Sequence, residues 1–170
     1  AGGALLHYAL HNSSRPLSLY FHIPFCERLC LYCGCNVVVK KDHAVAIPYV
    51  DWLQREMSLC SEAHGRPVTQ IHWGGGTPTY LEPKQIYELF NAIVSRFAVS
   101  KYAEISIEID PRVTSIEHLQ VLRSLGFNRL SVGIQDFDPQ VQQAVHRIQS
   151  FESTRQLFAE APRLQFESIN

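Results

Sequence analysis

The 170-residue sequence has no long hydrophobic run, no strong net charge and no N-terminal targeting pattern. About 20 consecutive apolar residues are needed to cross a bilayer, and the sequence contains no such run, so we expect no membrane span. The formal net charge of −1 gives no support for binding to nucleic acid or to a membrane surface. Residues 1–7 lack the basic-then-apolar order of a secretory signal.

Phosphate loops, disulfide frameworks, low-complexity segments and long-period repeats are missing as well. The glycines Gly74 to Gly76 are not followed by the Lys-Ser/Thr pair that a phosphate loop requires. Five cysteines is an odd number in a chain too long for a small secreted domain, which argues against a disulfide framework. The hydrophobic content of 46% is nevertheless sufficient for a buried core, so the chain is predicted to be globular.

Three of the cysteines have a spacing that favours an iron–sulfur cluster. Cys26, Cys30 and Cys33 form the pattern C-x-x-x-C-x-x-C, and three thiolates on one loop can ligate three irons of a four-iron cluster. The fourth iron would then be open to a small molecule. Zinc is an alternative, because Cys35 supplies a fourth thiol, although structural zinc usually takes ligand pairs from separate segments. Inert thiols are the third interpretation.

Strand-like and helix-like patterns alternate along the chain, which predicts βαβ units and a parallel sheet. Glu104, Ser106 and Glu108 alternate with isoleucines, so Glu108 would point into a barrel while the isoleucines pack against outer helices. The expected strands are 19–23, 68–73, 104–109, 129–134 and 164–169, and the expected helices are 47–60, 86–97, 116–125, 139–145 and 151–161.

Notable residues follow the carboxyl ends of four expected strands. The cysteines follow the first strand and Gly74 to Gly76 the second, while Glu108 lies late in the third and Gln135 after the fourth. Ligands of barrels and open α/β sheets bind at such ends, so we expect one site built from four loops. The glycines fit two interpretations equally, close approach of a ligand or a turn that needs positive φ.

The chain resembles the radical S-adenosylmethionine (SAM) superfamily, and within it the oxygen-independent coproporphyrinogen III oxidases of haem synthesis. Besides the cysteines, the resemblance lies in residues 19–26 (LYFHIPFC), 72–81 (HWGGGTPTYL), 104–112 (EISIEIDPR) and 126–137 (GFNRLSVGIQDF). It implies a partial (β/α) barrel of the TIM type, with about five parallel strands and flanking helices. Because members of the family are longer, residues 18–170 would be the first part of the radical SAM core, truncated, after a lead-in segment at 1–17.

The resemblance also implies an activity. A member of this family oxidatively decarboxylates two propionates of coproporphyrinogen III and yields protoporphyrinogen IX without oxygen. Its cofactors would be one [4Fe–4S] cluster and two molecules of SAM, which is cleaved to a 5′-deoxyadenosyl radical. The partners would be the porphyrinogen and a flavodoxin-type electron donor, with no nucleic acid and no membrane. An air-sensitive cluster and free thiols imply a reducing cytoplasm.

By resemblance, most notable residues take a role at the cofactors. The cluster ligands would be Cys26, Cys30 and Cys33, and the candidate catalytic residues would be Cys35 and Tyr20. The first SAM would contact Tyr20, Gly75 and Glu108. The second SAM would contact Tyr32, Gly76, Thr77, Gln135 and Arg147. The residues alone support simpler interpretations of some of these: Tyr20 as a core aromatic, Glu108 as an ion-pair partner and Arg147 as a solvated helix residue.

A haem-binding relative that keeps the cluster and delivers haem is the alternative function. That branch lacks a cysteine at the position of Cys35, so the pattern C-x-x-x-C-x-x-C-x-C favours the enzyme. A spare buried thiol is the alternative for Cys35. The nearby histidines, His22 and His72, are predicted to be hydrogen-bonded structural groups. Scattered cations are usually surface residues, but four could attract the propionates: Arg28, Lys40, Lys41 and Arg112.

Overall fold

The protein is described by a computed structural model that covers residue 8 and residues 13–60, 63 and 65–170. Five strands form one sheet in the order β1-β4-β5-β6-β7, and every pairing is parallel. Each new strand is added at the same edge of the sheet, as in a barrel and unlike a doubly wound sheet. The strands are β1 (Leu17–Ile23), β4 (Pro67–Gly75), β5 (Ala98–Ile109), β6 (Arg129–Val132) and β7 (Ser168–Ile169).

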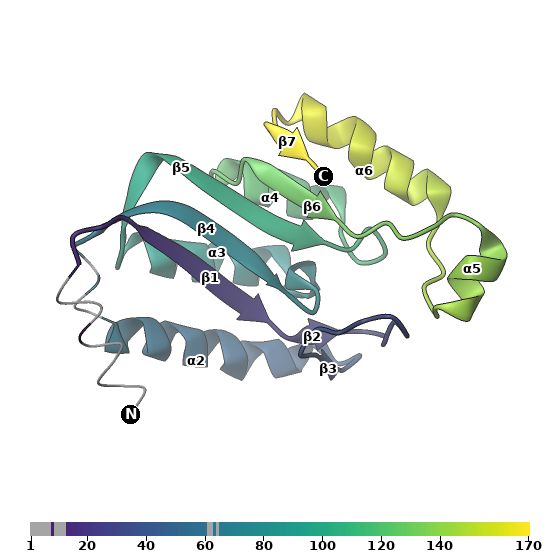
Figure 1. The fold of residues 1–170 in the computed structure, drawn as a ribbon, viewed down its shortest axis with the longest axis horizontal. Helices are drawn as coiled ribbons and strands as arrows, with labels where there is room; N and C mark the ends of the chain where they lie inside the picture. Colours follow the sequence, from purple (N-terminus) through teal and green to yellow (C-terminus); the bar gives the residue numbers. More distant parts are fainter. Residues whose placement is uncertain (1–7, 9–12, 61–62, 64) are drawn as a thin grey trace.

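Helices cover one face of this sheet (Figure 1). They pack against one another in the order α2-α3-α4-α6, while α5 stands beside the carboxyl ends of the strands (Figure 1). The helices are α2 (Ala46–Leu59), α3 (Pro83–Val94), α4 (Ile116–Ser124), α5 (Pro139–Ala144) and α6 (Phe151–Arg163), with the 3₁₀ turns η1 (His43–Val45) and η3 (Pro78–Tyr80). The predicted α/β architecture of a partial barrel is confirmed.

The two faces of the sheet differ in chemistry because side chains alternate along each strand. Trp73 and Ile107 are fully buried against the helices, and Trp73 packs edge-on against Phe127 with 5.4 Å between ring centroids. On the other face, a polar row runs through Tyr20, His72 and Ser106, which are partners in register across β1, β4 and β5. This polar face is the one that a barrel turns inward.

Several boundaries differ from those expected for local reasons. The last strand is only β7, instead of 164–169, because Leu164 caps α6 and Gln165 takes a positive φ of 64°. Helix α5 ends at Ala144, one residue earlier than expected, and His146, two residues further on, takes a positive φ of 53°. At the other end, Leu17 of the expected lead-in segment begins β1. Most of that segment, residues 1–7 and 9–12, lies outside the described residues.

His118 holds the start of α4 in place from inside the core. Its backbone N–H donates to the Ser115 hydroxyl (3.2 Å), and its Nδ1 accepts from the Ser115 backbone N–H (3.1 Å), which forms a capping box. Its Nε2 lies 3.0 Å from the Leu81 carbonyl oxygen, so this nitrogen carries the proton and donates. Burial lowers the pKa of His118 below its ordinary value.

We expect His118 to make the stability of the fold depend on pH below about 6.5, the ordinary pKa of histidine. The unfolded chain takes up a proton there while the folded chain keeps the imidazole neutral, so the free energy of unfolding falls as pH falls. The slope contributed by one such group approaches about 1.4 kcal/mol per pH unit. Denaturant unfolding of wild type and His118→Asn between pH 5 and 8 measures it. The variant should lose this slope and the exposed-site control His146→Asn should keep it; equal slopes in all three proteins would contradict the assignment.

Candidate active site

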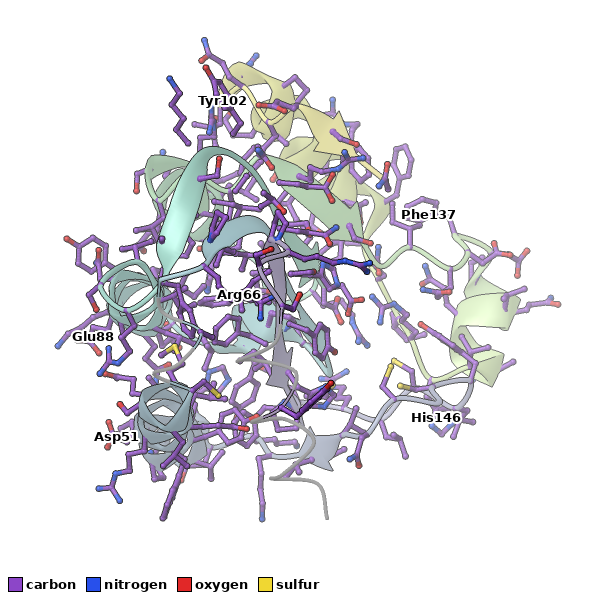
Figure 2. All side chains as sticks on the ribbon, turned by 60° about the vertical axis from the view of Figure 1, so that its left-hand side comes forward. Asp51, Arg66, Glu88, Tyr102, Phe137 and His146 are labelled. Carbon is purple, nitrogen blue, oxygen red and sulfur yellow. The ribbon has the colours of Figure 1, made fainter. Side chains whose placement is uncertain are left out.

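The cysteine loop follows the carboxyl end of β1, and backbone hydrogen bonds join its two ends. Its first residues, β2 (Phe25–Cys26), pair with β3 (Val38–Val39), and the Lys40 backbone N–H donates to the Cys26 carbonyl (2.9 Å). In the middle of the loop, the Leu31 N–H donates to the Val145 carbonyl beyond α5 (3.0 Å). Figure 2 shows a group of side-chain sulfur atoms near His146, where this loop passes that segment. The loop is therefore held as a unit above the sheet.

The three motif cysteines face different neighbours. The Cys26 sulfur lies 3.4 Å from the Thr77 hydroxyl, and burial raises the pKa of this thiol. Cys30 is buried, and its sulfur accepts from Arg112 Nη2 (3.5 Å) and Arg147 Nη1 (3.6 Å). Cys33 is half-buried. Three thiolates of a four-iron cluster bind three different irons, so they need not converge on one point. In the described part of the chain, no three His, Cys, Asp or Glu side chains converge on a single metal ion.

Cys35 stands apart from the motif cysteines as an exposed thiol. Lost hydration raises the pKa of the Cys35 thiol, and a hydrogen bond with Cys33 raises it further. Cys35 therefore stays protonated at neutral pH in the metal-free chain. The interpretation of Cys35 as a spare buried thiol is wrong, because its side chain is at the surface of the loop.

The glycines at the end of β4 each have a packing reason. Gly75 takes a φ of +116°, and a Cβ there would lie 2.7 Å from the His22 ring. A Cβ on Gly76 would lie 2.6 Å from the Pro24 carbonyl oxygen. A turn with positive φ, one of the two interpretations, is thus present at Gly75, and the missing side chains let β4 lie against the start of the cysteine loop.

We expect Gly76→Ala to destabilise the fold by about 1–3 kcal/mol, the usual cost of overpacking. The added methyl group would meet the backbone oxygens of Pro24 and Phe25, and a backbone cannot rotate away as a flexible side chain can. Gly34→Ala, on the cysteine loop, is the control glycine substitution, because a Cβ there meets no atom within 4 Å; it should change stability by less than about 0.5 kcal/mol. Chemical unfolding of the metal-free chain compares them, and equal stability of both variants would refute this packing role of Gly76.

Tyr20 and Glu108 lie on the inward polar face with two histidines. The Tyr20 ring is exposed and stacks on His72 with 5.8 Å between centroids, and its hydroxyl lies 3.1 Å from His22 Nδ1. The Glu108 carboxylate accepts from the Gly75 backbone N–H (3.2 Å) and lies 3.5 Å from His72 Nε2. Both histidines make hydrogen bonds, as predicted. Tyr20 is not a core aromatic, so the interpretation drawn from strand propensity is wrong.

Arg147 is buried and lies outside any helix, so its interpretation as a solvated helix residue is wrong. It follows α5 in the chain, and its Nη2 donates to the Gly133 carbonyl (2.6 Å) and lies 3.3 Å from Asp110 Oδ1. Arg112 donates to the same carboxylate through Nε (3.0 Å) and Nη2 (2.6 Å). Arg112 is therefore engaged in the site and is not a scattered surface cation.

Sequence reasoning missed Asp110. Its carboxylate is buried between Arg112 and Arg147, and both arginines reach the sulfur of Cys30. The available signal was its place directly after a strand, at the same edge of the sheet as the cysteines and glycines. The rule that ligand-binding residues lie at the carboxyl ends of strands identified Glu108, and it applies equally to Asp110.

Most of the predicted ligand-binding residues line one cavity of about 290 Å³ beside the cysteine loop. Its wall includes Gly76, Thr77, Glu108, Gln135 and Arg147, together with Asp110 and Gly133. Tyr20, Tyr32, Cys35 and Gly75 lie outside this wall. Three thiols on one loop, beside a polar cavity at the carboxyl ends of four strands, form a donor set that suits an iron–sulfur cluster with a small ligand next to it.

Comparison with known families decides between cluster and zinc. Residues 20–170 match the sequence profile of the radical SAM superfamily. The chain belongs to this superfamily. Membership implies a [4Fe–4S] cluster and SAM as cofactors.

Specific relatives are similar over nearly the whole chain. Oxygen-independent coproporphyrinogen III oxidases of Synechocystis sp. and Escherichia coli are each 45% identical, over 91% and 98% of this chain. The solved structure of coproporphyrinogen III oxidase from E. coli, described as a radical SAM enzyme, superposes with a TM-score of 0.94 over 99% of this chain. The chain spans 34% and 37% of the two relatives' sequences and 39% of the solved chain. Among the described residues of this radical SAM chain, no helix has the length and apolarity to cross a membrane.

Proposed function

We propose that the protein acts in the oxygen-independent conversion of coproporphyrinogen III to protoporphyrinogen IX, by oxidative decarboxylation of two propionates to vinyl groups. The observation that carries this proposal is the set of four cysteines: a cluster motif followed by Cys35, in a fold that superposes on a coproporphyrinogen III oxidase with a TM-score of 0.94. We further propose that residues 18–170 are the first part of the radical SAM core, after a lead-in segment at 1–17.

When bound, the reduced cluster would supply the single electron with which SAM is cleaved to methionine and a 5′-deoxyadenosyl radical. The protein would hold the cluster through Cys26, Cys30 and Cys33. Glu108, fixed by the Gly75 N–H, would accept hydrogen bonds from the ribose hydroxyls of SAM through its carboxylate. Tyr20 lies on the same polar face, with its hydroxyl 3.1 Å from His22 Nδ1, and would hold a proton for the reaction.

A second SAM molecule would occupy the 290 Å³ cavity. Gly76, Thr77 and Gln135 line this cavity, and Tyr32 is exposed on the cysteine loop. Arg147 lines this cavity and hydrogen-bonds to Gln149 through Nε, to Cys30 through Nη1 and to Gly133 through Nη2, so its fixed guanidinium would supply a positive charge to a ligand carboxylate. Support for this site is the convergence of Gly76, Thr77, Gln135 and Arg147 on one cavity wall, from the end of β4 and from the chain beyond β6.

The electron donor would be a flavodoxin-type reductant, and the compartment would be the cytoplasm. The support is chemical: none of the five cysteines, all of them among the described residues, forms a disulfide, and an air-sensitive cluster persists only under reducing conditions. The nearly neutral charge of the chain gives no reason to add nucleic acid or a membrane surface to its partners.

The test is an anaerobic turnover assay of the reconstituted protein with SAM, a reductant and coproporphyrinogen III. Formation of protoporphyrinogen IX through the intermediate with one vinyl group is the expected result. A haem titration of the same sample examines the alternative of a haem-delivering relative, which the presence of Cys35 disfavours. Stoichiometric haem binding without turnover would replace the proposed reaction by haem delivery.

A further inference from the structure

Two guanidinium groups converge on the sulfur of one motif cysteine. The Cys30 sulfur accepts from Arg112 Nη2 at 3.5 Å and from Arg147 Nη1 at 3.6 Å. Cys26 instead has the neutral Thr77 hydroxyl near its sulfur. The three predicted cluster ligands therefore differ in their electrostatic surroundings.

Asp110 fixes both arginines in this arrangement. Arg112 Nε lies 3.0 Å from both Oδ1 and Oδ2 of the carboxylate, and Nη2 lies 2.6 Å from Oδ2, a contact by two nitrogens that only a guanidinium provides. Arg147 Nη2 lies 3.3 Å from Oδ1 of the same carboxylate. Asp110 in turn accepts from the Arg112 backbone N–H at 3.0 Å. The carboxylate thus orients both guanidinium groups without touching the sulfur.

The charges in this group are poorly screened. The side chains of Asp110, Arg147 and Arg112 are 8%, 9% and 18% exposed, so their interactions are stronger than those of surface ions. One carboxylate and two guanidinium groups leave a net charge of +1 beside Cys30. Reduction adds one negative charge to a cluster, and hydrogen bonds to its sulfurs together with nearby positive charge make that addition more favourable.

We propose that Arg112, oriented by Asp110, raises the reduction potential of the cluster by donating a hydrogen bond to the Cys30 sulfur. Asp110 is the positioning residue in this arrangement. The flavodoxin-type donor of the proposed function supplies the electron, its flavin hydroquinone being oxidised to the semiquinone, and the cluster takes up this electron without gain of a proton. The inference rests on the cluster of the proposed function but on neither its substrate nor its product. Arg112 is the residue to test, because Arg147 also lines the proposed SAM cavity.

The experiment is a potentiometric titration of the reconstituted protein, followed by electron paramagnetic resonance in the absence of SAM. Arg112→Met keeps the length of the side chain but removes its charge and its donors. At a fixed potential, we expect the ratio of reduced to oxidised cluster to fall about tenfold, which is a downward shift of 59 mV for a one-electron couple. Arg129→Met is the matched control: it removes an arginine that pairs with Glu104 at the opposite end of the strands, and its ratio should stay at the wild-type value.

Arg112→Lys keeps the charge but loses the two-pronged geometry, so its ratio should fall by a smaller factor, about threefold. Iron and sulfide analysis shows that each compared sample carries a full cluster. If Arg112→Met retains the cluster at an unchanged potential, the inference is overturned. If Arg112→Met takes up no cluster, the reduction potential of Arg112→Lys is the deciding measurement. A wild-type potential in Arg112→Lys would also overturn the inference. Failure of the wild-type protein to convert coproporphyrinogen III would remove the proposed reaction and leave this measurement intact.

Discussion

Replacing Cys26, Cys30 or Cys33 by alanine is expected to abolish the brown chromophore of the reconstituted cluster, whereas Cys35→Ala should keep it. The three motif thiols each supply one iron ligand, and a cluster that loses one of three protein ligands has a second open iron exposed to solvent. Cys35 is exposed and hydrogen-bonds to Cys33, and it lies outside the motif spacing. The effect should be all-or-none for the first three variants.

Visible absorbance, iron and sulfide content and electron paramagnetic resonance after anaerobic reconstitution measure this result. Cys60→Ala is a matched control, since Cys60 is a half-buried thiol at the end of α2, away from the cysteine loop. It should bind a full cluster. Loss of the cluster in Cys35→Ala to the same extent as in Cys26→Ala would contradict the assignment of three ligands and one open iron.

Cys35→Ser is expected to separate cleavage of SAM from turnover of the porphyrinogen. If Cys35 acts after SAM is cleaved, the variant should still form 5′-deoxyadenosine under reducing conditions. Protoporphyrinogen formation should fall by about 10²-fold or more, the usual contribution of a positioned acid–base group. The reason is positional: Cys35 lies two residues beyond a cluster ligand, with an exposed side chain that can reach a substrate.

Quantification of 5′-deoxyadenosine and of porphyrin products in the same reaction checks both halves of this expectation. Cys60→Ser is the matched control and should keep both activities. Wild-type oxidase activity in Cys35→Ser would remove the catalytic role of Cys35, and with it the main residue-level reason to prefer the oxidase over haem delivery.

The parts of the fold that were predictable are those governed by local patterns. The alternation of isoleucines with Glu104, Ser106 and Glu108 identified both faces of β5 correctly, because neighbouring side chains of a strand point to opposite faces. Ser115 caps the start of α4 and Gly126, beyond its end, has a φ of +98°, which are the residue types that favour these two positions. The end of α5 and the start of β7 were misplaced. A residue with positive φ lies near each of them, His146 after α5 and Gln165 before β7, and neither histidine nor glutamine is a usual signal for such a conformation.

For the candidate site, the sequence by itself determined the motif, its loop and the edge of the sheet where it lies. The spacing of Cys26, Cys30 and Cys33 and the alternation of strands and helices along the chain are patterns of neighbouring residues, so both can be recognised from the sequence. Glu108 and Gln135 were placed at the same edge by the same rule, and both line the cavity beside the loop.

Only the tertiary structure decided how Arg112 and Arg147 are used. Their contacts with Cys30 join residues 82 and 117 positions apart in the chain, and no periodicity or spacing relates such positions. An arginine in a sequence reads as a solvated cation until its partner is known, and that partner, Asp110, follows the middle strand of the sheet. Burial of a charge is favourable only when the folded chain supplies a counter-charge and hydrogen bonds at the same point. That requirement is met by packing between distant segments, which is why the structure was needed to see it.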